Sequence, residues 1–276
     1  MEYITLNDGV AIPQLGFGVW QIPDATAFEA VTTALEVGYR HVDTAALYYN
    51  ETGVGRAMRD SGVPREDVFL TTKLWNGDHG YDAALRAFDS SLERLGTDYV
   101  DLYLIHWPVP QQDLYVESWR ALEKIASDGR ARSIGVSNFT AQTLERLLKE
   151  SETVPAINQI ELHPYFPQRA MREFDQRHGI ATEAWSPLGQ GGELLNEPLL
   201  ARIGAEHGKT PAQVVIRWHL QLGNVVIPKS VTPSRIRENF EVFDFELTPE
   251  EVADITALSR DGGRIGPDPA VFNYVG

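Results

Sequence analysis

The sequence contains no cysteine among its 276 residues, which excludes disulfide bonds, thiolate catalysis and cysteine-ligated metal. It also has no run of about 18 apolar residues of the kind that crosses a bilayer. The first residues, MEYITLNDG, have neither the basic nor the apolar segment of a signal peptide. From these absences we expect a cytoplasmic protein without a membrane partner.

Positive charge is scarce in this chain. The formal net charge is −15, which argues against nucleic acids and anionic membranes as partners. There are only five lysines, so the position of each is informative: Lys73, Lys124, Lys149, Lys209 and Lys229. The histidines show no HExxH-like spacing, and we expect no metal site.

Strand and helix patterns alternate along the whole chain. A hairpin signal covers 2–12, with Asn7-Asp8-Gly9 as its turn. Apolar strand patterns then alternate with amphipathic helix patterns. The predicted strands lie in 15–20, 40–43, 68–73, 100–108, 133–138, 156–161, 180–185 and 225–229. The predicted helices are 25–37, 51–60, 82–95, 114–128, 140–150, 167–178, 197–207, 211–222, 233–242 and 248–258.

Eight strand–helix units without a long linker predict an α/β protein, a single (β/α)8 TIM barrel domain over 1–276. The hairpin precedes the barrel, and an extra C-terminal helix and a Gly/Pro-rich, irregular tail follow it. LGFGVW, 15–20, contains G-x-G but no third glycine two residues later. The fingerprint of a doubly wound dinucleotide-binding sheet is therefore not met.

The residues at the predicted strand ends form a non-random set. In barrels of this kind the active site is built at the carboxyl ends of the strands and on the loops that follow them. Two of the five lysines and four of the six tryptophans fall there. The positions are Trp20, Asp43, Tyr48, Lys73, Trp75, His106, Trp107, Ser137, Asn138, Gln159, Glu161, Trp185, Ser186, Lys229 and Ser230.

Four of these residues predict proton-transfer chemistry. Asp43 ends a buried strand, which is costly unless a cation meets it. Lys73 ends the neighbouring strand, about 4.8 Å away, and can pair with it. A nearby ammonium favours a phenolate, so we expect a pKa for Tyr48 below the usual value of about 10. We interpret Tyr48 as acid/base, Lys73 as its modulator, Asp43 as the anchor of Lys73, and His106 as a second hydrogen-bonding group.

Each member of this set also has a structural interpretation. The pair of Asp43 and Lys73 is equally consistent with a structural ion pair. Taken alone, Tyr48 is typical of the core or surface, and His106 is typical of a satisfied core histidine. Their convergence on adjacent strand ends at one face favours catalysis.

Two further groups of residues predict ligand contacts. Trp20, Trp75 and Trp107 are consistent with core packing, but their positions on loops favour a hydrophobic substrate wall. After the last strand, Lys229 and Ser230 precede a helix that carries Arg235 in its first turn, an arrangement that suits an anion. The alternative for this second group is a solvated basic patch.

Several motifs resemble those of the aldo-keto reductases over nearly the whole chain. They are GYRHVDTAALYYNE, LTTKLW, VDLYLIHWP, SIGVSNF, INQIELHP and IPKSVTPSRIREN. The resemblance implies an NADPH-dependent barrel reductase in which Tyr48 is the general acid and Asp43, Lys73 and His106 complete a tetrad. It also implies cofactor contacts by Ser137, Asn138 and Gln159 at the carboxamide, Trp185 on the nicotinamide ring, Ser186, Leu188, Gln190 and Gly191 at the pyrophosphate, Lys229, Ser230, Val231 and Arg235 at the 2′-phosphate, and Glu238 and Asn239 near the adenine.

Within the family, LNDG, TTKLWN, SPLGQG, KTPAQVVIRWHLQ and FDFELT are similar to bacterial 2,5-diketo-D-gluconate reductases. The implied substrate is an aldehyde or ketone, either such a sugar ketoacid or a methylglyoxal-type dicarbonyl, and the implied state is a monomer. Tyr49 stands where glycine is usual, and Thr232 replaces an arginine. Two other classes stay open: a barrel aldolase with Lys73 as Schiff base, and a non-catalytic cofactor-binding subunit.

Overall fold

Eight parallel strands form the centre of the molecule. The computed structural model describes all 276 residues. The strands lie side by side in the order β10-β9-β8-β7-β6-β5-β4-β3. Their bounds are β3 (Phe17–Gly18), β4 (His41–Asp43), β5 (Phe69–Leu74), β6 (Val100–Ile105), β7 (Ala131–Ser137), β8 (Ile157–Glu161), β9 (Ala181–Trp185) and β10 (Val225–Val226).

Backbone hydrogen bonds join the first strand to the last. The amide of Gly16 donates to the carbonyl of Val226 over 2.9 Å, and the amide of Val226 donates to Gln14 over 2.8 Å. The sheet therefore closes on itself as the predicted barrel, which leaves no unpaired strand edge.

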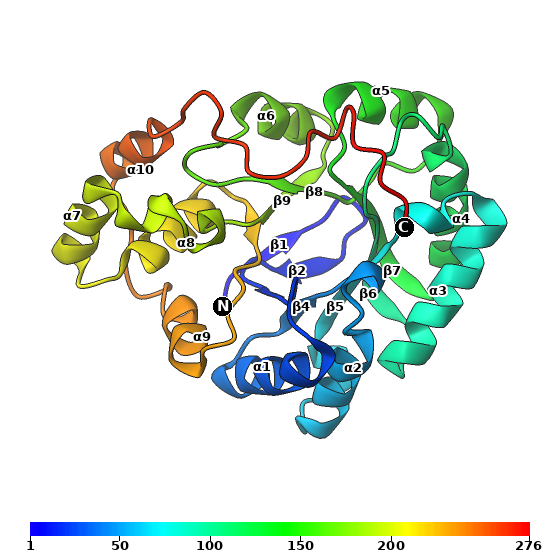
Figure 1. Cartoon of the computed structure of the whole chain (residues 1–276), viewed down its shortest axis with the longest axis horizontal. Helices are drawn as coiled ribbons and strands as arrows, with labels where there is room; N and C mark the ends of the chain where they lie inside the picture. Colours follow the sequence, from blue (N-terminus) through cyan, green and yellow to red (C-terminus); the bar gives the residue numbers. More distant parts are fainter.

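Helices surround the sheet on its outside (Figure 1). They are α1 (Asp24–Val37), α2 (Glu51–Asp60), α3 (Tyr81–Leu95), α4 (Tyr115–Ser127), α5 (Ala141–Glu150), α6 (Arg169–Arg177), α7 (Pro198–His207), α8 (Pro211–Gln221), α9 (Pro233–Phe240) and α10 (Pro249–Thr256). Three of them begin at a threonine whose side chain accepts from the backbone in a capping box: Thr140, Thr210 and Thr248. None of the helices is long and apolar enough to cross a membrane.

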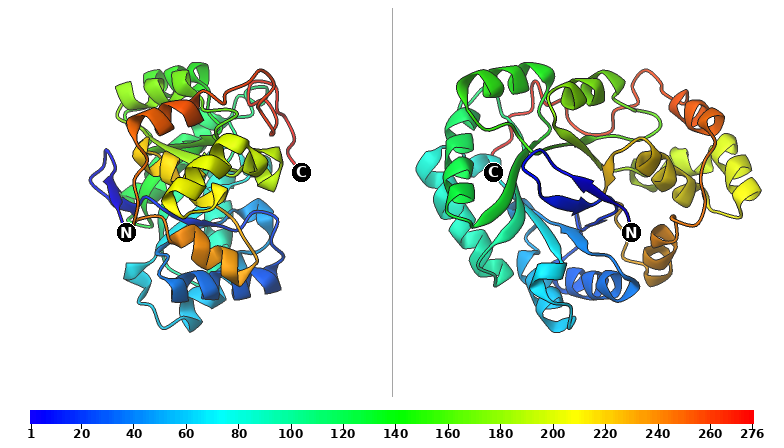
Figure 2. Two further views of the ribbon diagram at one scale, coloured as in Figure 1. Left: turned by 90° about the vertical axis from the view of Figure 1, so that its left-hand side faces the viewer. Right: turned by 180° about the vertical axis from the view of Figure 1, so that it is seen from behind.

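The two ends of the barrel are covered by the two ends of the chain (Figure 2). The predicted hairpin is present as β1 (Tyr3–Thr5) paired antiparallel with β2 (Ala11–Pro13). Its Leu6 and Ile12 pack against strand side chains such as Leu102 and Val225 and seal one end. The tail after α10 is irregular, as predicted, and crosses the opposite end.

Three strands are shorter than predicted by three residues or more, and the first of them, expected in 15–20, covers only Phe17–Gly18. The strand expected over 100–108 ends at Ile105, and the one expected over 225–229 ends at Val226. Pro108 and Pro228 lack the N–H that a sheet ladder requires and cannot donate to a neighbouring strand, although the carbonyl of Pro228 still accepts from the amide of Gly18 over 3.2 Å. Short 3-10 turns were also not predicted: η1 (Ala46–Tyr48), η2 (Arg65–Asp67), η3 (Asn76–Asp78), η4 (Gly189–Gly191) and η5 (Glu193–Asn196).

Candidate active site

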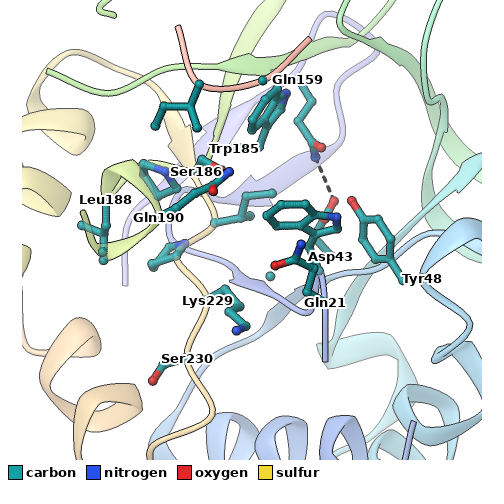
Figure 3. A pocket seen from close by; sticks show the side chains of 18 of the residues that line it. Gln21, Asp43, Tyr48, Gln159, Trp185, Ser186, Leu188, Gln190, Lys229 and Ser230 are labelled. Carbon is teal, nitrogen blue, oxygen red and sulfur yellow. Dashed lines mark hydrogen bonds between the residues drawn. The ribbon is translucent and has the colours of Figure 1, made fainter. Parts of the chain in front are cut away.

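A cavity of about 1000 Å³ opens at the end of the barrel that the tail crosses (Figure 3). Every predicted cofactor and substrate residue lines it, and so do Asp43, Tyr48 and His106. Lys73 is the one predicted site residue that does not line the cavity, because its side chain is completely buried beneath it. Residues from strand ends that are far apart in the chain therefore come together at one cavity.

Lys73 and Asp43 form a buried ion pair. Lys73 Nζ donates to Asp43 Oδ1 over 2.6 Å and to the carbonyl of Thr44 over 2.9 Å. The relative exposure of the two residues is 0% and 2%. Burial lowers the pKa of the Lys73 ammonium, but the Asp43 carboxylate and the Tyr48 phenol outweigh it, so the pKa is raised overall. Lys73 is therefore a fixed cation at neutral pH.

The direction predicted for the pKa of Tyr48 is wrong. Tyr48 lies on η1, and its ring centroid is 5.2 Å from Lys73 Nζ. Burial raises the pKa of the phenol, and the attraction of Lys73 only partly offsets it, so the pKa lies above 10.0. The sequence indicated that Lys73 lies near Tyr48 and lowers its pKa, but it did not indicate how strongly burial of the phenol raises that pKa. In the free protein the phenol holds its proton at neutral pH.

His106 follows β6 and packs edge-on against two aromatic rings. Its ring centroid lies 5.6 Å from that of Tyr48 and 5.4 Å from that of Trp75. Burial, together with Lys73 and His79, lowers the pKa of His106 well below 6.5. The imidazole is therefore neutral at pH 7, with one nitrogen that donates and one that accepts.

Glu183 was not predicted, yet it belongs to the same group of residues. Gln159 Nε2 donates to Asp43 Oδ2 over 2.8 Å and to Glu183 Oε2 over 3.0 Å. Glu183 lies inside β9 and is completely buried. Burial and the Asp43 carboxylate raise its pKa to about 8. The available signal was an acid within IATEAW, a strand that is otherwise largely apolar.

The opposite part of the cavity carries exposed cations. Lys229 and Arg235 line it near the start of α9, and neither side chain forms an ion pair. The hydroxyl of Ser230 accepts from the amide of Thr232 over 3.1 Å. Thr232, the residue that replaces an arginine of some related enzymes, is the N-cap of α9. Its side chain forms no capping hydrogen bond there. In this region Glu238 already accepts from the hydroxyl of Thr210.

Aromatic side chains enclose the cavity beside Tyr48 and His106. Trp75 and Trp107 are each 8% exposed, and Trp20 is 40% exposed at the rim. Trp107 packs on Phe272 of the tail with ring centroids 4.3 Å apart. Trp75 and Trp107 thus share one apolar cluster with Phe272, a tail residue that the sequence did not single out, whereas Trp20 lines the cavity outside that cluster.

The tail is bound to the barrel by specific hydrogen bonds. Glu161 Oε2 accepts from the amide of Gly266 over 2.8 Å, and Asn76 Nδ2 donates to the carbonyl of Tyr274 over 2.8 Å. A Cβ on Gly266 would lie 2.5 Å from the ring of Trp185, so the tail requires glycine for this close approach. Tail residues missing from the predicted site, Ile265, Gly266, Pro267, Phe272 and Tyr274, therefore line the cavity.

Tyr49 has a clear structural position. It ends η1 in the left-handed conformation, with φ 53° and ψ 30°, and its side chain is 83% exposed. Glycine adopts this conformation without strain, which agrees with the glycine expected there. The side chain points away from the cavity, although its neighbour Tyr48 lines it.

The family is established by sequence similarity over nearly the whole chain. The profile of the aldo/keto reductase family matches residues 14–260. The chain belongs to the aldo/keto reductase family. An "Aldo-keto reductase" of Mycolicibacterium smegmatis is 59% identical over 273 residues, which cover 99% of this chain and 98% of that protein. A protein of Escherichia coli named "Methylglyoxal reductase DkgA" is 51% identical over 270 residues, which cover 98% and 97% of the two chains.

Two solved structures have the same fold as this chain. A mutant of Gox0644 crystallised in complex with NADPH is 49% identical, with a TM-score of 0.95 and 99% of each chain covered. The aldo/keto reductase from Brucella melitensis is 57% identical, with a TM-score of 0.91, and the match covers 94% of this chain and 99% of that one. The TIM barrel inferred from the sequence is thereby confirmed.

Proposed function

We propose that this aldo/keto reductase uses NADPH to reduce the carbonyl group of a small, uncharged aldehyde or dicarbonyl. The observation that carries the proposal is the buried pair of Asp43 and Lys73 beneath a protonated phenol, Tyr48, and a neutral imidazole, His106. The unpaired cations Lys229 and Arg235 fit the 2′-phosphate of NADPH at the other part of the cavity. The NADPH complex of Gox0644 supports this choice of cofactor.

In this reaction NADPH supplies the hydride when bound, and Tyr48 gives the proton to the carbonyl oxygen. The raised pKa of Tyr48 keeps that proton in place until the oxygen gains charge. The positive charge of the Lys73 ammonium then stabilises the phenolate that is left on Tyr48. Asp43 keeps Lys73 protonated by raising its pKa. The remaining donor is His106, whose neutral ring can direct an N–H at the carbonyl oxygen.

The charges of the cavity favour an uncharged substrate. Its charged lining residues are Asp43, Lys229, Arg235 and Glu238. Neither cation lies in the aromatic wall beside Tyr48, so that region offers no ion pair to a carboxylate. Methylglyoxal carries no charge, whereas 2,5-diketo-D-gluconate carries one carboxylate. The name of the Escherichia coli relative supports the first, and the motifs described above keep the second as the competing candidate.

The other two classes are less well supported. A Schiff-base lysine needs an amine that loses its proton near neutral pH. The pKa of Lys73 is raised, and its ammonium is bonded to Asp43 and Thr44. A non-catalytic subunit would not need the complete set of Tyr48, Lys73, Asp43 and His106 at one cavity. A single catalytic domain that acts as a monomer stays our prediction.

A substrate panel tests the proposal. Oxidation of NADPH is followed with methylglyoxal, with an aromatic aldehyde and with 2,5-diketo-D-gluconate, under matched conditions. We expect kcat/KM to be higher for the two uncharged substrates than for the sugar acid. A preference for the sugar acid contradicts the assignment of substrate, and the absence of NADPH oxidation with all three contradicts the assignment as a reductase. Borohydride added with substrate should leave Lys73 unmodified.

A further inference from the structure

The hydrogen-bonding capacity of two predicted carboxamide contacts is largely used within the protein. The hydroxyl of Ser137 donates to the carbonyl of Gln159 over 2.8 Å and accepts from Asn138 Nδ2 over 3.1 Å. Asn138 Nδ2 also donates to the carbonyl of His106 over 2.9 Å, which uses its second N–H. Asn138 Oδ1 accepts from the indole of Trp185 over 2.8 Å.

Gln159 differs from these two residues. Both N–H groups of its side-chain amide donate to acidic side chains, one to Asp43 and one to Glu183. Its amide oxygen accepts no hydrogen bond from the protein, and Gln159 lines the cavity. Figure 3 shows its amide directed at Asp43, beside Tyr48. The oxygen of Gln159 is therefore the acceptor that remains open to an amide N–H of a ligand.

The carboxyl groups of Asp43 and Glu183 also fix the orientation of the Gln159 amide. If the amide were turned over, its oxygen would face the ionised Asp43, which is held by Lys73, and the contact would be repulsive. One hydrogen bond to Asp43 alone leaves the amide free to swing about that bond. The second bond, to Glu183, defines the plane of the amide and hence the direction of its free oxygen.

We propose that Glu183 is a positioning residue for the cofactor: with Asp43 it holds the amide of Gln159 so that the oxygen accepts from the carboxamide of nicotinamide. The inference rests on the proposed use of NADPH. Glu183 does not line the cavity, so its effect on a bound ligand passes through Gln159. Its other carboxyl oxygen lies 3.7 Å from His41 Nε2 and has no hydrogen bond.

The test removes and then restores the acceptor at position 183. Glu183→Leu deletes it with an apolar side chain of similar size, and Glu183→Gln keeps an oxygen for Gln159. Isothermal titration calorimetry measures three ligands: NADP+, its 3-acetylpyridine analogue, which lacks the carboxamide N–H, and 2′-phospho-ADP-ribose, which lacks the ring altogether. Thermal unfolding of each variant checks the fold, and Glu183→Ala replaces the leucine variant if the latter does not fold.

We expect Glu183→Leu to bind NADP+ about fivefold more weakly, the effect of roughly one net hydrogen bond. Binding of 2′-phospho-ADP-ribose and of the acetylpyridine analogue should stay at wild-type strength, and Glu183→Gln should retain NADP+ binding. Equal weakening of all three ligands, or unchanged NADP+ binding in Glu183→Leu, overturns the inference. If the wild-type protein binds none of the ligands, the proposed function fails as well, and this outcome is distinct from the other two.

Discussion

The two parts of the cavity hold their charges in opposite ways. Beside the aromatic wall, Asp43 and Lys73 are buried, paired and fixed by neighbouring strands. At the start of α9, Lys229 and Arg235 are exposed and unpaired. Charges of the first kind lose their hydration when the protein folds, so no further desolvation is needed when a proton is transferred beside them. Charges of the second kind are screened by water and salt until an anion replaces that water.

The contrast predicts which substitutions affect the fold and which affect binding. A change among the buried groups leaves a partner uncompensated and should lower stability. A change among the exposed cations should leave stability intact and weaken ligand binding. The four predictions that follow test this contrast.

Replacing Lys73 should have the largest effect on stability. Lys73→Met leaves the Asp43 carboxylate buried without its cation, which typically costs about 3–5 kcal/mol of unfolding free energy. Lys229→Met is the matched control, and at an exposed position its effect should stay within about 0.5 kcal/mol. Urea unfolding of both variants measures the difference. Equal effects at the two lysines would remove the contrast between the two parts of the cavity.

Replacing Arg235 should weaken cofactor binding without a loss of stability. Arg235→Ala removes the charged contact that we propose with the 2′-phosphate, and we expect a loss of about tenfold or more in affinity for NADP+. Affinity for NAD+, which lacks that phosphate, should not change. Arg237→Ala is the control, because Arg237 belongs to the same helix but does not line the cavity. Titration with NADP+ at two salt concentrations adds a check. The affinity of the wild-type protein should fall more steeply with salt than that of Arg235→Ala.

Glu183 predicts a pH dependence of stability. Its pKa is raised from 4.5 to about 8, so the folded protein keeps a proton that the unfolded chain releases. Stability contributed by this proton is therefore lost as the pH rises from about 5 to 8. Around Glu183 lie Asp43, Lys73, Gln159 and His41, and His41 stays neutral in this range because burial lowers its pKa to about 3.

Glu183→Gln removes the titrating group and should become more stable relative to wild type as the pH rises. The slope should be at most about 1.4 kcal/mol per pH unit. Urea unfolding of both proteins at pH 5, 6, 7 and 8 gives the difference at each pH. A constant difference across this range would mean that Glu183 does not titrate there.

Tyr49→Gly should have the smallest effect on stability, and it should raise the stability rather than lower it. The left-handed backbone costs a non-glycine residue about 1–2 kcal/mol, while glycine adds back about 0.5–1 kcal/mol of chain entropy. We expect a net gain of a few tenths to about 1 kcal/mol in stability, with unchanged NADP+ affinity because Tyr49 lies outside the cavity. Loss of stability in this variant would show that the tyrosine ring contributes packing.

The comparison of Asp43 with Glu183 explains what the sequence revealed and what it did not. Asp43 was found because it ends a strand beside a strand that ends in Lys73. Glu183 is also an acid in a buried strand, but it lies inside β9 rather than at its end. The same reasoning, that a buried acid needs a partner, applies to both. It fails for Glu183 when only strand ends are considered.

Contacts between distant segments account for most of the remainder. Glu161 was recognised as a strand-end residue, but its bond to Gly266 joins residues 105 positions apart. No local pattern predicts where an irregular tail settles, so Phe272 and Tyr274 were missing from the predicted site. Burial was the other missing quantity: the sequence indicated that Lys73 is near Tyr48, but not that desolvation outweighs it in setting the pKa.

The most direct test of the central claim compares two adjacent tyrosines. Tyr48→Phe and Tyr49→Phe remove the same hydroxyl, one inside the cavity and one in solvent. Reduction of methylglyoxal by NADPH is measured as kcat/KM, with NADP+ affinity as the check on folding. We predict a loss of about 10²–10⁴-fold for Tyr48→Phe, typical of a lost general acid, and wild-type rates for Tyr49→Phe. Wild-type turnover by Tyr48→Phe would contradict the account.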